Sequence, residues 1–457
     1  MTKASLIVRN GTVVTAESTF RADVAIDGGV FTEIAAPGEL SSTAGEEYDA
    51  EGKYLLPGVV DGHVHFREPG LEYKEDWETG SRAAVYGGVT TVIDMPNTLP
   101  TTSTVENARE KQSLAESKSY CDFALFGLIV QENVDQIVPM AEQRLVVGYK
   151  VFLGLTIGNL PRPDDGMLID ALREATKVGL RVGFHAENNE IMQHRIRQMQ
   201  ESGRSDPLAH LDSRPVIAEL ESIQRMSLFA KEAGAKIHIF HLSSGPGLQM
   251  IDEWRAKGVD ITTETGAHYV FLNSDDMTRL GAMMRMNPPV REPGHDAVLL
   301  QGLVDGRING IATDHSPHPR EEKLDDDIWK ALSGFAGVET SVRMFLTHAV
   351  NTGRMTLPQF ARATSTGPAK TWGLYPRKGA IQIDSDADLT VIDLNHEGVI
   401  EEEALHGKNN ASPFLGQRTK GAPVSTIVRG RLVVRDGVLD AAARGTGRLV
   451  GPMVTGA

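Results

Sequence analysis

The chain has 457 residues, of which 40% are hydrophobic and 23% charged, as in a soluble globular protein with room for a large domain and a smaller one. Its net charge of −15 argues against a nucleic-acid partner, because phosphate binding needs a basic face. The same charge does not exclude an anionic small molecule, since a pocket can be locally cationic on an acidic protein.

Both ends of the chain are predicted to be rich in β-strands. Short β-forming runs alternate there with turn sequences that contain Gly, Asn or Asp. In chain order these are 6–8, Asn10-Gly11, 12–15, 23–26, Asp27-Gly28-Gly29, 387–393, and 425–435 with Arg429-Gly430 inside it and Asp436-Gly437 after it. We predict one small β-sandwich domain built from residues 1–55 and 378–457.

The middle of the chain alternates apolar runs with helix-forming sequence. Eight predicted strands span 55–60, 89–95, 123–130, 146–153, 181–185, 236–242, 260–265 and 308–313, with helices such as 167–178, 216–233 and 247–257 between them. This alternation predicts an α/β fold, a (β/α)₈ TIM barrel over residues 56–377. An open doubly wound sheet is the alternative, but no Gly-x-Gly-x-x-Gly turn follows an early strand.

The chain has one cysteine, Cys121, in an apolar run that predicts a small buried core residue. A disulfide within the chain is therefore impossible, which fits a cytoplasmic location. The first residues lack the apolar core of a signal peptide, and no stretch approaches the ~18 apolar residues of a membrane span. We expect a cytoplasmic protein that has no membrane partner.

Histidines and one aspartate fall at the ends of predicted strands, where barrel enzymes place their active sites. These residues are His63, His65, His185, His241 and Asp314. His63 and His65 are two apart, so in an extended strand they point to the same side. A single histidine here would more often be a hydrogen-bonded structural residue. Four with one carboxylate predict a site for zinc or a related divalent ion.

Lys150 lies inside the fourth predicted strand, among apolar neighbours. A buried ammonium next to metal cations is strongly unfavourable. A neutral lysine, however, can take up carbon dioxide. The resulting carbamate could bridge two cations ~3.5–4 Å apart. The alternative is a lysine whose ammonium reaches solvent past the strand end.

These motifs resemble those of the cyclic amidohydrolases, which are dihydroorotase, allantoinase and hydantoinase. The resemblance runs almost end to end, through residues 57–65, 87–91, 148–150, 185–188, 241–244, 287–291, 313–318 and 412–414. It implies an enzyme that opens a cyclic amide by hydrolysis of a C–N bond, and a β domain built from both termini. It also implies a homodimer or homotetramer.

The resemblance implies a role for each candidate residue. One metal is held by His63, His65 and Asp314, and a second by His185 and His241, with carbamylated Lys150 between them. Zinc is the first choice, although manganese, cobalt and iron accept the same ligands. Asp314 is expected to take a proton from the attacking hydroxide and to return it to the leaving ring nitrogen.

Three further residues indicate a substrate with a carboxylate. In dihydroorotases the positions of Arg67, Asn97 and His318 hold the substrate carboxylate, and these side chains suit that task as hydrogen-bond donors. Asn287 is expected to bind the ring. The alternative for Arg67 is an ion pair with Glu68 or Glu72 on the same loop.

Other segments favour other rings. Residues 185–188 are similar to a hydantoinase, and residues 264–269 to an allantoinase or hydantoinase. Asp164 or Asp165 could be a rival bridge, because the segment resembles a loop that supplies an aspartate in many bacterial dihydroorotases. D-hydantoinases have a tyrosine five residues after the bridging lysine, where this chain has Leu155.

We therefore expect a dihydroorotase-like enzyme whose substrate is dihydroorotate. A carboxylated hydantoin is the second choice of substrate and allantoin the third. A serine nucleophile is a competing class, since Ser243, Ser244 and Ser316 lie near histidines, but there is no Gly-x-Ser-x-Gly turn. A non-catalytic, hydantoinase-like assembly protein is disfavoured by the intact ligand positions. A mononuclear deaminase is disfavoured by Lys150.

Overall fold

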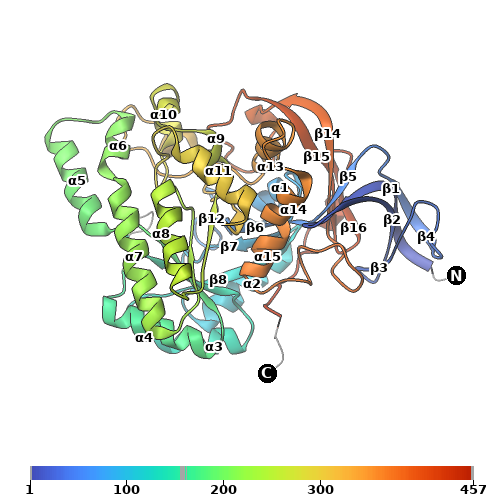
Figure 1. Cartoon of the computed structure of the whole chain (residues 1–457), viewed down its shortest axis with the longest axis horizontal. Coiled ribbons are helices and arrows are strands. Elements are labelled where there is room, and N and C mark those ends of the chain that lie inside the picture. The colour runs from blue at the N-terminus through green and yellow to red at the C-terminus, as the bar shows by residue number, and fades with distance from the viewer. Residues whose placement is uncertain (1–2, 155–159, 161, 454–457) are drawn as a thin grey trace.

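The computed structural model describes residues 3–154, 160 and 162–453. Figure 1 shows two parts, a strand-lined core wrapped by helices and a β-rich part at one end of the molecule. The blue N-terminal and red C-terminal strands lie together in this β-rich part. Within the described residues, no helix is long and apolar enough to cross a membrane.

The β-rich part is a mostly antiparallel sheet of nine strands in the described chain. Their order is β17-β16-β15-β14-β5-β1-β2-β3, with β4 also paired to β1. The bounds are β1 (Lys3–Val14), β2 (Thr19–Asp27), β3 (Val30–Ala35), β4 (Thr43–Asp49), β5 (Tyr54–Pro57), β14 (Leu389–Val399), β15 (Arg418–Val428), β16 (Arg431–Arg435) and β17 (Val438–Leu439). The predicted β domain from both termini is confirmed, because β5 pairs with β1 on one side and β14 on the other.

The turn predicted at Asn10-Gly11 is wrong. β1 continues through both residues, and its pairing with β2 shifts register between Val8 and Gly11. Asn10 has a φ of 59°, and its N–H donates to Asp23 at 2.8 Å. A β-bulge uses the same residue types as a tight turn, so the sequence alone does not separate the two.

The barrel contains eight parallel strands among the described residues, in the order β13-β12-β11-β10-β9-β8-β7-β6. The bounds are β6 (Val59–Val64), β7 (Val89–Asp94), β8 (Asp122–Leu128), β9 (Gly148–Phe152), β10 (Arg181–His185), β11 (Ile237–Ile239), β12 (Ile261–Thr265) and β13 (Gly310–Ile311). A parallel bridge between Val64 and His315 joins the first strand to the segment after the last. The predicted TIM barrel is confirmed.

The first predicted barrel strand, 55–60, is divided between the two sheets. Leu55 belongs to β5 of the terminal sheet, and the barrel strand begins at Val59. The chain changes sheets at Gly58, whose N–H donates to the carbonyl of Asp388 at 2.9 Å. A Cβ at Gly58 would lie 2.1 Å from Thr90 Oγ1, so only glycine fits at this close crossing.

Helices cover the outside of the barrel (Figure 1). The α-helices are α1 (Trp77–Tyr86), α2 (Val105–Lys118), α3 (Ile137–Glu142), α4 (Asp165–Lys177), α5 (Asn189–Glu201), α6 (Pro207–Ser213), α7 (Val216–Ala233), α8 (Gly245–Ala256), α9 (Ala267–Phe271), α10 (Ser274–Leu280), α11 (His295–Asp305), α12 (Arg320–Lys323), α13 (Ser341–Phe345), α14 (Leu357–Ala361) and α15 (Gly367–Thr371). The prediction for 216–233 matches α7 from end to end. Cys121, directly before β8, is fully buried, as predicted.

Candidate active site

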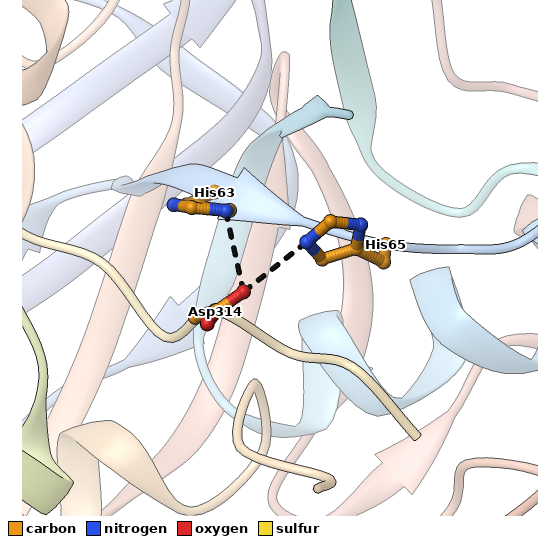
Figure 2. A group of neighbouring side chains, drawn as sticks. All are labelled: His63, His65 and Asp314. Atoms are coloured by element: carbon orange, nitrogen blue, oxygen red, sulfur yellow. Dashed lines mark hydrogen bonds and ion pairs between the residues drawn. The ribbon is translucent and has the colours of Figure 1, made fainter. Parts of the chain in front are cut away.

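His63, His65 and Asp314 meet at the carboxyl ends of the first and last barrel strands. Figure 2 shows the His63 imidazole on β6, the His65 imidazole directly after it, and the Asp314 carboxylate facing both from the segment after β13. Asp314 Oδ1 lies 3.2 Å from His63 Nε2 and 3.1 Å from His65 Nε2. One ligand atom from each of the three residues lies within 4.8 Å of the others. The group could hold a metal ion.

The hydrogen bonds on the far sides of these imidazoles determine which nitrogen carries the proton. His63 Nδ1 lies 2.7 Å from Glu264 Oε1, and His65 Nδ1 lies 2.7 Å from Asn97 Oδ1. Burial lowers the pKa of both histidines, so both are neutral. With Nδ1–H donating, each Nε2 presents a lone pair to the Asp314 carboxylate. Three acceptors that converge in this way fit a divalent cation.

His185 and His241 form a second pair at the ends of strands five and six. His185 Nδ1 lies 2.9 Å from His241 Nε2. The other ring nitrogen of His185, Nε2, donates to Glu187 Oε2 at 2.8 Å. Burial raises the pKa of Glu187, but the Arg214 charge and the hydrogen bond from His185 outweigh it and lower the pKa to about 2. Glu187 is therefore an anion that orients His185.

Lys150 lies in the same cavity as these four histidines and Asp314. Its side chain is fully buried, and its Nζ has no hydrogen-bond partner among the described residues. Nζ lies 3.7 Å from the centre of the Phe240 ring. Burial lowers the pKa of Lys150 to about 7, so a large share of the amine is neutral near neutral pH. The alternative, in which the Lys150 ammonium reaches solvent past the strand end, is therefore wrong.

Arg67 also lines this cavity, and it is 2% exposed. Burial lowers the pKa of its guanidinium to about 10. Its Nη2 lies 3.4 Å from His318 Nε2, and its Nε has no hydrogen-bond partner in the described chain. The alternative ion pairs on its own loop are not formed. Glu68 instead pairs with Lys118, and Glu72 accepts from the Gly70 N–H at 2.8 Å.

The other three predicted substrate-binding residues are placed differently. Asn97 and Asn287 line the cavity, while His318 does not contribute to its wall. The Asn97 side-chain oxygen is already engaged by His65, so its amide nitrogen is the group left for a substrate. Asn287 Oδ1 accepts from Ser333 Oγ at 3.2 Å. His318 lies behind Arg67, where its Nε2 is 3.1 Å from the Ser333 carbonyl.

Asp164 and Asp165, the rival bridges, lie outside the cavity. Asp164 caps the N-terminus of α4 by accepting from the Met167 N–H at 2.9 Å. Asp165 pairs with Arg225 on α7 at 2.8 Å. Neither reaches the histidines, so this alternative is wrong. Leu155 is outside the described residues.

The candidate serine nucleophiles have other partners. The hydroxyls of Ser243 and Ser244 donate to the Glu219 carboxylate, and Ser316 Oγ donates to Asp314 Oδ1 at 3.3 Å. A hydroxyl that donates to a carboxylate in this way is not paired with a histidine base, as serine catalysis requires.

Sequence reasoning missed the carboxylates that support the histidines. Glu264 is buried at the end of β12, where it contacts His63, and its Oε2 lies 3.3 Å from His238 Nε2. Glu187 and its partner Arg214 do the same for His185. Glu264 could have been found, because it follows the strand-end rule that identified the histidines. Arg214 lies in a connecting segment and not at a strand end, so its position in the sequence does not indicate a role in the site.

The amidohydrolase family model matches residues 54–433. An allantoinase of Solibacter usitatus is 39% identical over 429 residues, which cover 93% of both chains. An L-hydantoinase of Paenarthrobacter aurescens is 36% identical and covers 94% of this chain and 95% of its own.

The chain belongs to the amidohydrolase family. Within it, the chain falls in the cyclic amidohydrolase group and is a hydrolase of C–N bonds in cyclic amides. The solved structure of an L-hydantoinase (dihydropyrimidinase) from Arthrobacter aurescens superimposes with a TM-score of 0.95 at 35% identity, covering 98% of this chain and 100% of that one. A D-hydantoinase from a Thermus species gives a TM-score of 0.89 at 32% identity, covering 98% of this chain and 99% of its own.

Proposed function

We propose that this amidohydrolase opens a five-membered ureide ring, either allantoin or a 5-substituted hydantoin. The relatives with the names allantoinase and L-hydantoinase match nearly the whole chain. They favour this pair over dihydroorotate, the substrate first expected from the sequence. The observation that carries the proposal is the cavity itself, in which His63, His65 and Asp314 converge beside the buried amine of Lys150.

The donor set fits two divalent cations. His63, His65 and Asp314 would hold one, and His185 and His241 the other. Lys150, as a carbamate, would supply an oxygen to each. The neutral amine that carbamylation needs is favoured by the apolar surroundings of Lys150. Zinc is our first choice for both ions. When bound, such ions supply a nucleophile at neutral pH and polarise the scissile carbonyl.

The residues of the chain would orient the substrate ring and transfer the proton. Asp314 is in reach of the cavity centre and accepts a proton from the attacking water, then returns it to the leaving ring nitrogen. Asn287 and the amide nitrogen of Asn97 would bind the ring, since both line the cavity. Glu264 and Glu187 would hold the imidazoles in the tautomer that keeps their free nitrogens toward the cavity.

A carboxylated ring is the second candidate, and the charges around Arg67 favour it. Arg67 and Lys74 are both buried, at 2% and 4% exposure. Only Glu322 forms an ion pair with either of them in the described chain. A buried cation without a partner is costly, and a substrate carboxylate would offset that cost. A hydantoin with an acidic side chain would pair with the Arg67 charge and is also a ring of the class that the hydantoinase relatives are named for.

The test is direct hydrolysis of allantoin and of a 5-substituted hydantoin, followed as appearance of the ring-opened ureido acid. The protein is first supplied with zinc and bicarbonate. We expect ring opening of at least one. If both rings stay closed while dihydroorotate is hydrolysed, the first expectation from the sequence is restored.

We also propose that the enzyme acts in the cytoplasm on a small molecule, as a homodimer or homotetramer, with no nucleic-acid or membrane partner. The net charge of −15 supports the absence of nucleic acid. Light scattering on the purified protein measures the oligomeric state, and a monomer would contradict this part of the proposal.

A further inference from the structure

Two consecutive residues after β6, Lys74 and Glu75, are buried charges, and neither lines the cavity. Their exposures are 4% and 0%. Each faces a different histidine of the segment 314–318, Lys74 facing His318 and Glu75 facing His315. Burying a charge costs free energy unless the surroundings satisfy it, so both contacts are specific features of this loop.

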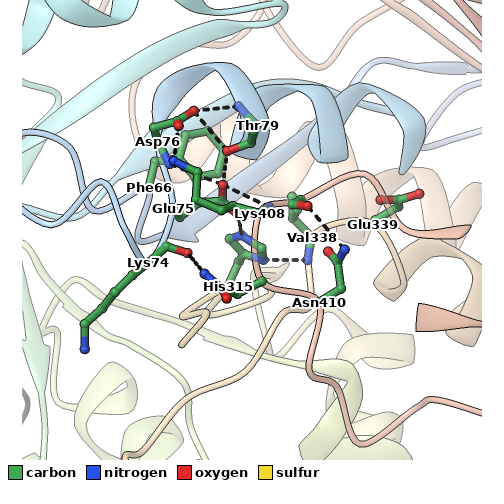
Figure 3. Close-up of polar contacts among 12 residues, drawn as sticks. Phe66, Lys74, Glu75, Asp76, Thr79, His315, Val338, Glu339, Lys408 and Asn410 are labelled. Atoms are coloured by element: carbon green, nitrogen blue, oxygen red, sulfur yellow. Dashed lines mark hydrogen bonds and ion pairs between the residues drawn. The ribbon is translucent and has the colours of Figure 1, made fainter. Parts of the chain in front are cut away.

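Glu75 lies between the start of α1 and the segment that carries Asp314. Figure 3 shows its carboxylate with Thr79 on one side and His315 on the other. It accepts from the Thr79 hydroxyl and from the Lys408 N–H at 3.3 Å and 3.2 Å. Glu75 Oε2 lies 3.6 Å from His315 Nε2. These backbone and hydroxyl donors fix the carboxylate opposite the imidazole.

His315 connects Glu75 to the catalytic segment. Its Nδ1 accepts from the backbone N–H groups of Gly337 at 3.1 Å and Val338 at 3.4 Å. The ring proton therefore sits on Nε2, which faces Glu75. The His315 carbonyl accepts from the His65 N–H at 2.8 Å. The ring is thus held at Nδ1 and the backbone at its carbonyl, while Nε2 has Glu75 as its charged neighbour at 3.6 Å.

Asp314 needs such support because its backbone is strained. Its φ is 48°, in the left-handed region that non-glycine residues rarely adopt. Such a conformation persists only where surrounding contacts determine it. The contact of Glu75 with the next residue, His315, is one of these contacts.

Lys74 contacts the other histidine of this segment, His318, which lies next to Arg67. Its Nζ donates to Glu322 Oε2 at 2.6 Å and to His318 Nδ1 at 3.1 Å. Because Nδ1 of His318 accepts, its Nε2 carries the proton and donates to the Ser333 carbonyl at 3.1 Å. The same ring lies 3.4 Å from Arg67 Nη2. Lys74 thereby fixes the ring behind Arg67 and adds a second positive charge there.

We propose that Lys74 and Glu75 are positioning residues with separable effects. Glu75 acts through His315 on the placement of Asp314, and so on turnover. Lys74 acts through His318 on Arg67, and so on recognition of an anionic substituent of the ring. The Lys74 part rests on the carboxylated ring of the proposed function, whereas the Glu75 part holds for any cyclic amide.

The test compares Glu75→Gln and Lys74→Met with the wild-type holoenzyme. Glu75→Gln keeps the shape of the side chain and should lower kcat about 10- to 100-fold with little change in KM, because a small misplacement of Asp314 slows the proton transfer. It should also speed the loss of metal to a chelator. Glu78→Gln is the control, since this α1 carboxylate pairs with Arg444 and contacts neither Glu75 nor His315.

Lys74→Met should raise KM about tenfold for a carboxylated hydantoin and leave KM for unsubstituted hydantoin unchanged. Lys74→Arg should restore part of the difference. The affinity of the carboxylated ring-opened product, measured by calorimetry, should fall in parallel.

Wild-type kcat and chelator resistance in folded Glu75→Gln would overturn the Glu75 assignment. If that variant does not fold, His315→Gln removes the other partner, and wild-type values there have the same consequence. An equal rise in KM for both rings would overturn the Lys74 assignment. A wild-type holoenzyme that opens neither ring would instead contradict the proposed function.

Discussion

His63 Nδ1 lies 2.7 Å from Glu264 Oε1, a buried contact between β6 and β12. Burial raises the pKa of Glu264, and its hydrogen bond with Nδ1 leaves Nε2 of His63 facing Asp314. Glu264→Gln should therefore weaken metal binding about 10- to 100-fold. Competition with a chromogenic chelator measures this. The exposed Glu253→Gln on α8 is the matched control, and equal metal affinity in both variants would argue against a supporting role for Glu264.

Lys150→Ala should remove the bridging group between the two proposed cations. We expect elemental analysis to find about two divalent ions per wild-type chain and fewer in the variant, with activity lost. Short carboxylic acids should restore part of the activity by replacing the carbamate. Lys231→Ala, on the exposed face of α7, should behave as wild type. An unchanged metal content and rate in Lys150→Ala would show that another group bridges.

Arg67→Met should weaken transition-state binding of a carboxylated ring by about 2–5 kcal/mol, the cost of removing one partner from a buried charge pair. The ratio of kcat/KM between wild type and variant gives this value. Hydrolysis of unsubstituted hydantoin should change far less. Arg109→Met, at an exposed site of α2, controls for the loss of a charge. Indifference of both rings to Arg67 would favour a neutral substrate.

Cys121 should be unreactive in the folded protein. Burial raises the pKa of its thiol to about 12, and the side chain is inaccessible. Since the thiolate is the reactive form, a thiol reagent should label no cysteine in native protein and one per chain in denaturant. Rapid labelling without denaturant would mean that the start of β8 opens readily.

The sequence was sufficient for the barrel and for the convergence at its mouth. Strand ends can be recognised from apolar runs, and parallel strands bring their ends together. His63, His65 and Asp314 could therefore be placed near one another from the order of the strands alone. The division of 55–60 between two sheets could not be predicted. It depends on the close approach of Gly58 to Thr90 and Asp388, which are far away in the sequence.

The surroundings of the site depended on tertiary contacts. The sequence offered Glu68 and Glu72 as partners of Arg67, but Glu68 is taken by Lys118 on α2. His318 was expected to hold the substrate carboxylate, and its contacts in the fold are with Lys74, Ser333 and Arg67. Such assignments depend on which groups compete for one donor in the folded chain, and a single sequence does not reveal that competition.

The most direct test of the proposed function is kcat/KM of the enzyme, loaded with metal and bicarbonate, on a panel of cyclic amides. The panel contains allantoin, hydantoin, carboxymethylhydantoin, dihydroorotate and dihydrouracil. We predict that a five-membered ureide ring is opened fastest, with carboxymethylhydantoin ahead of hydantoin because of Arg67. Faster opening of dihydroorotate or dihydrouracil than of every five-membered ring, in protein shown to contain its metal, would contradict the proposal.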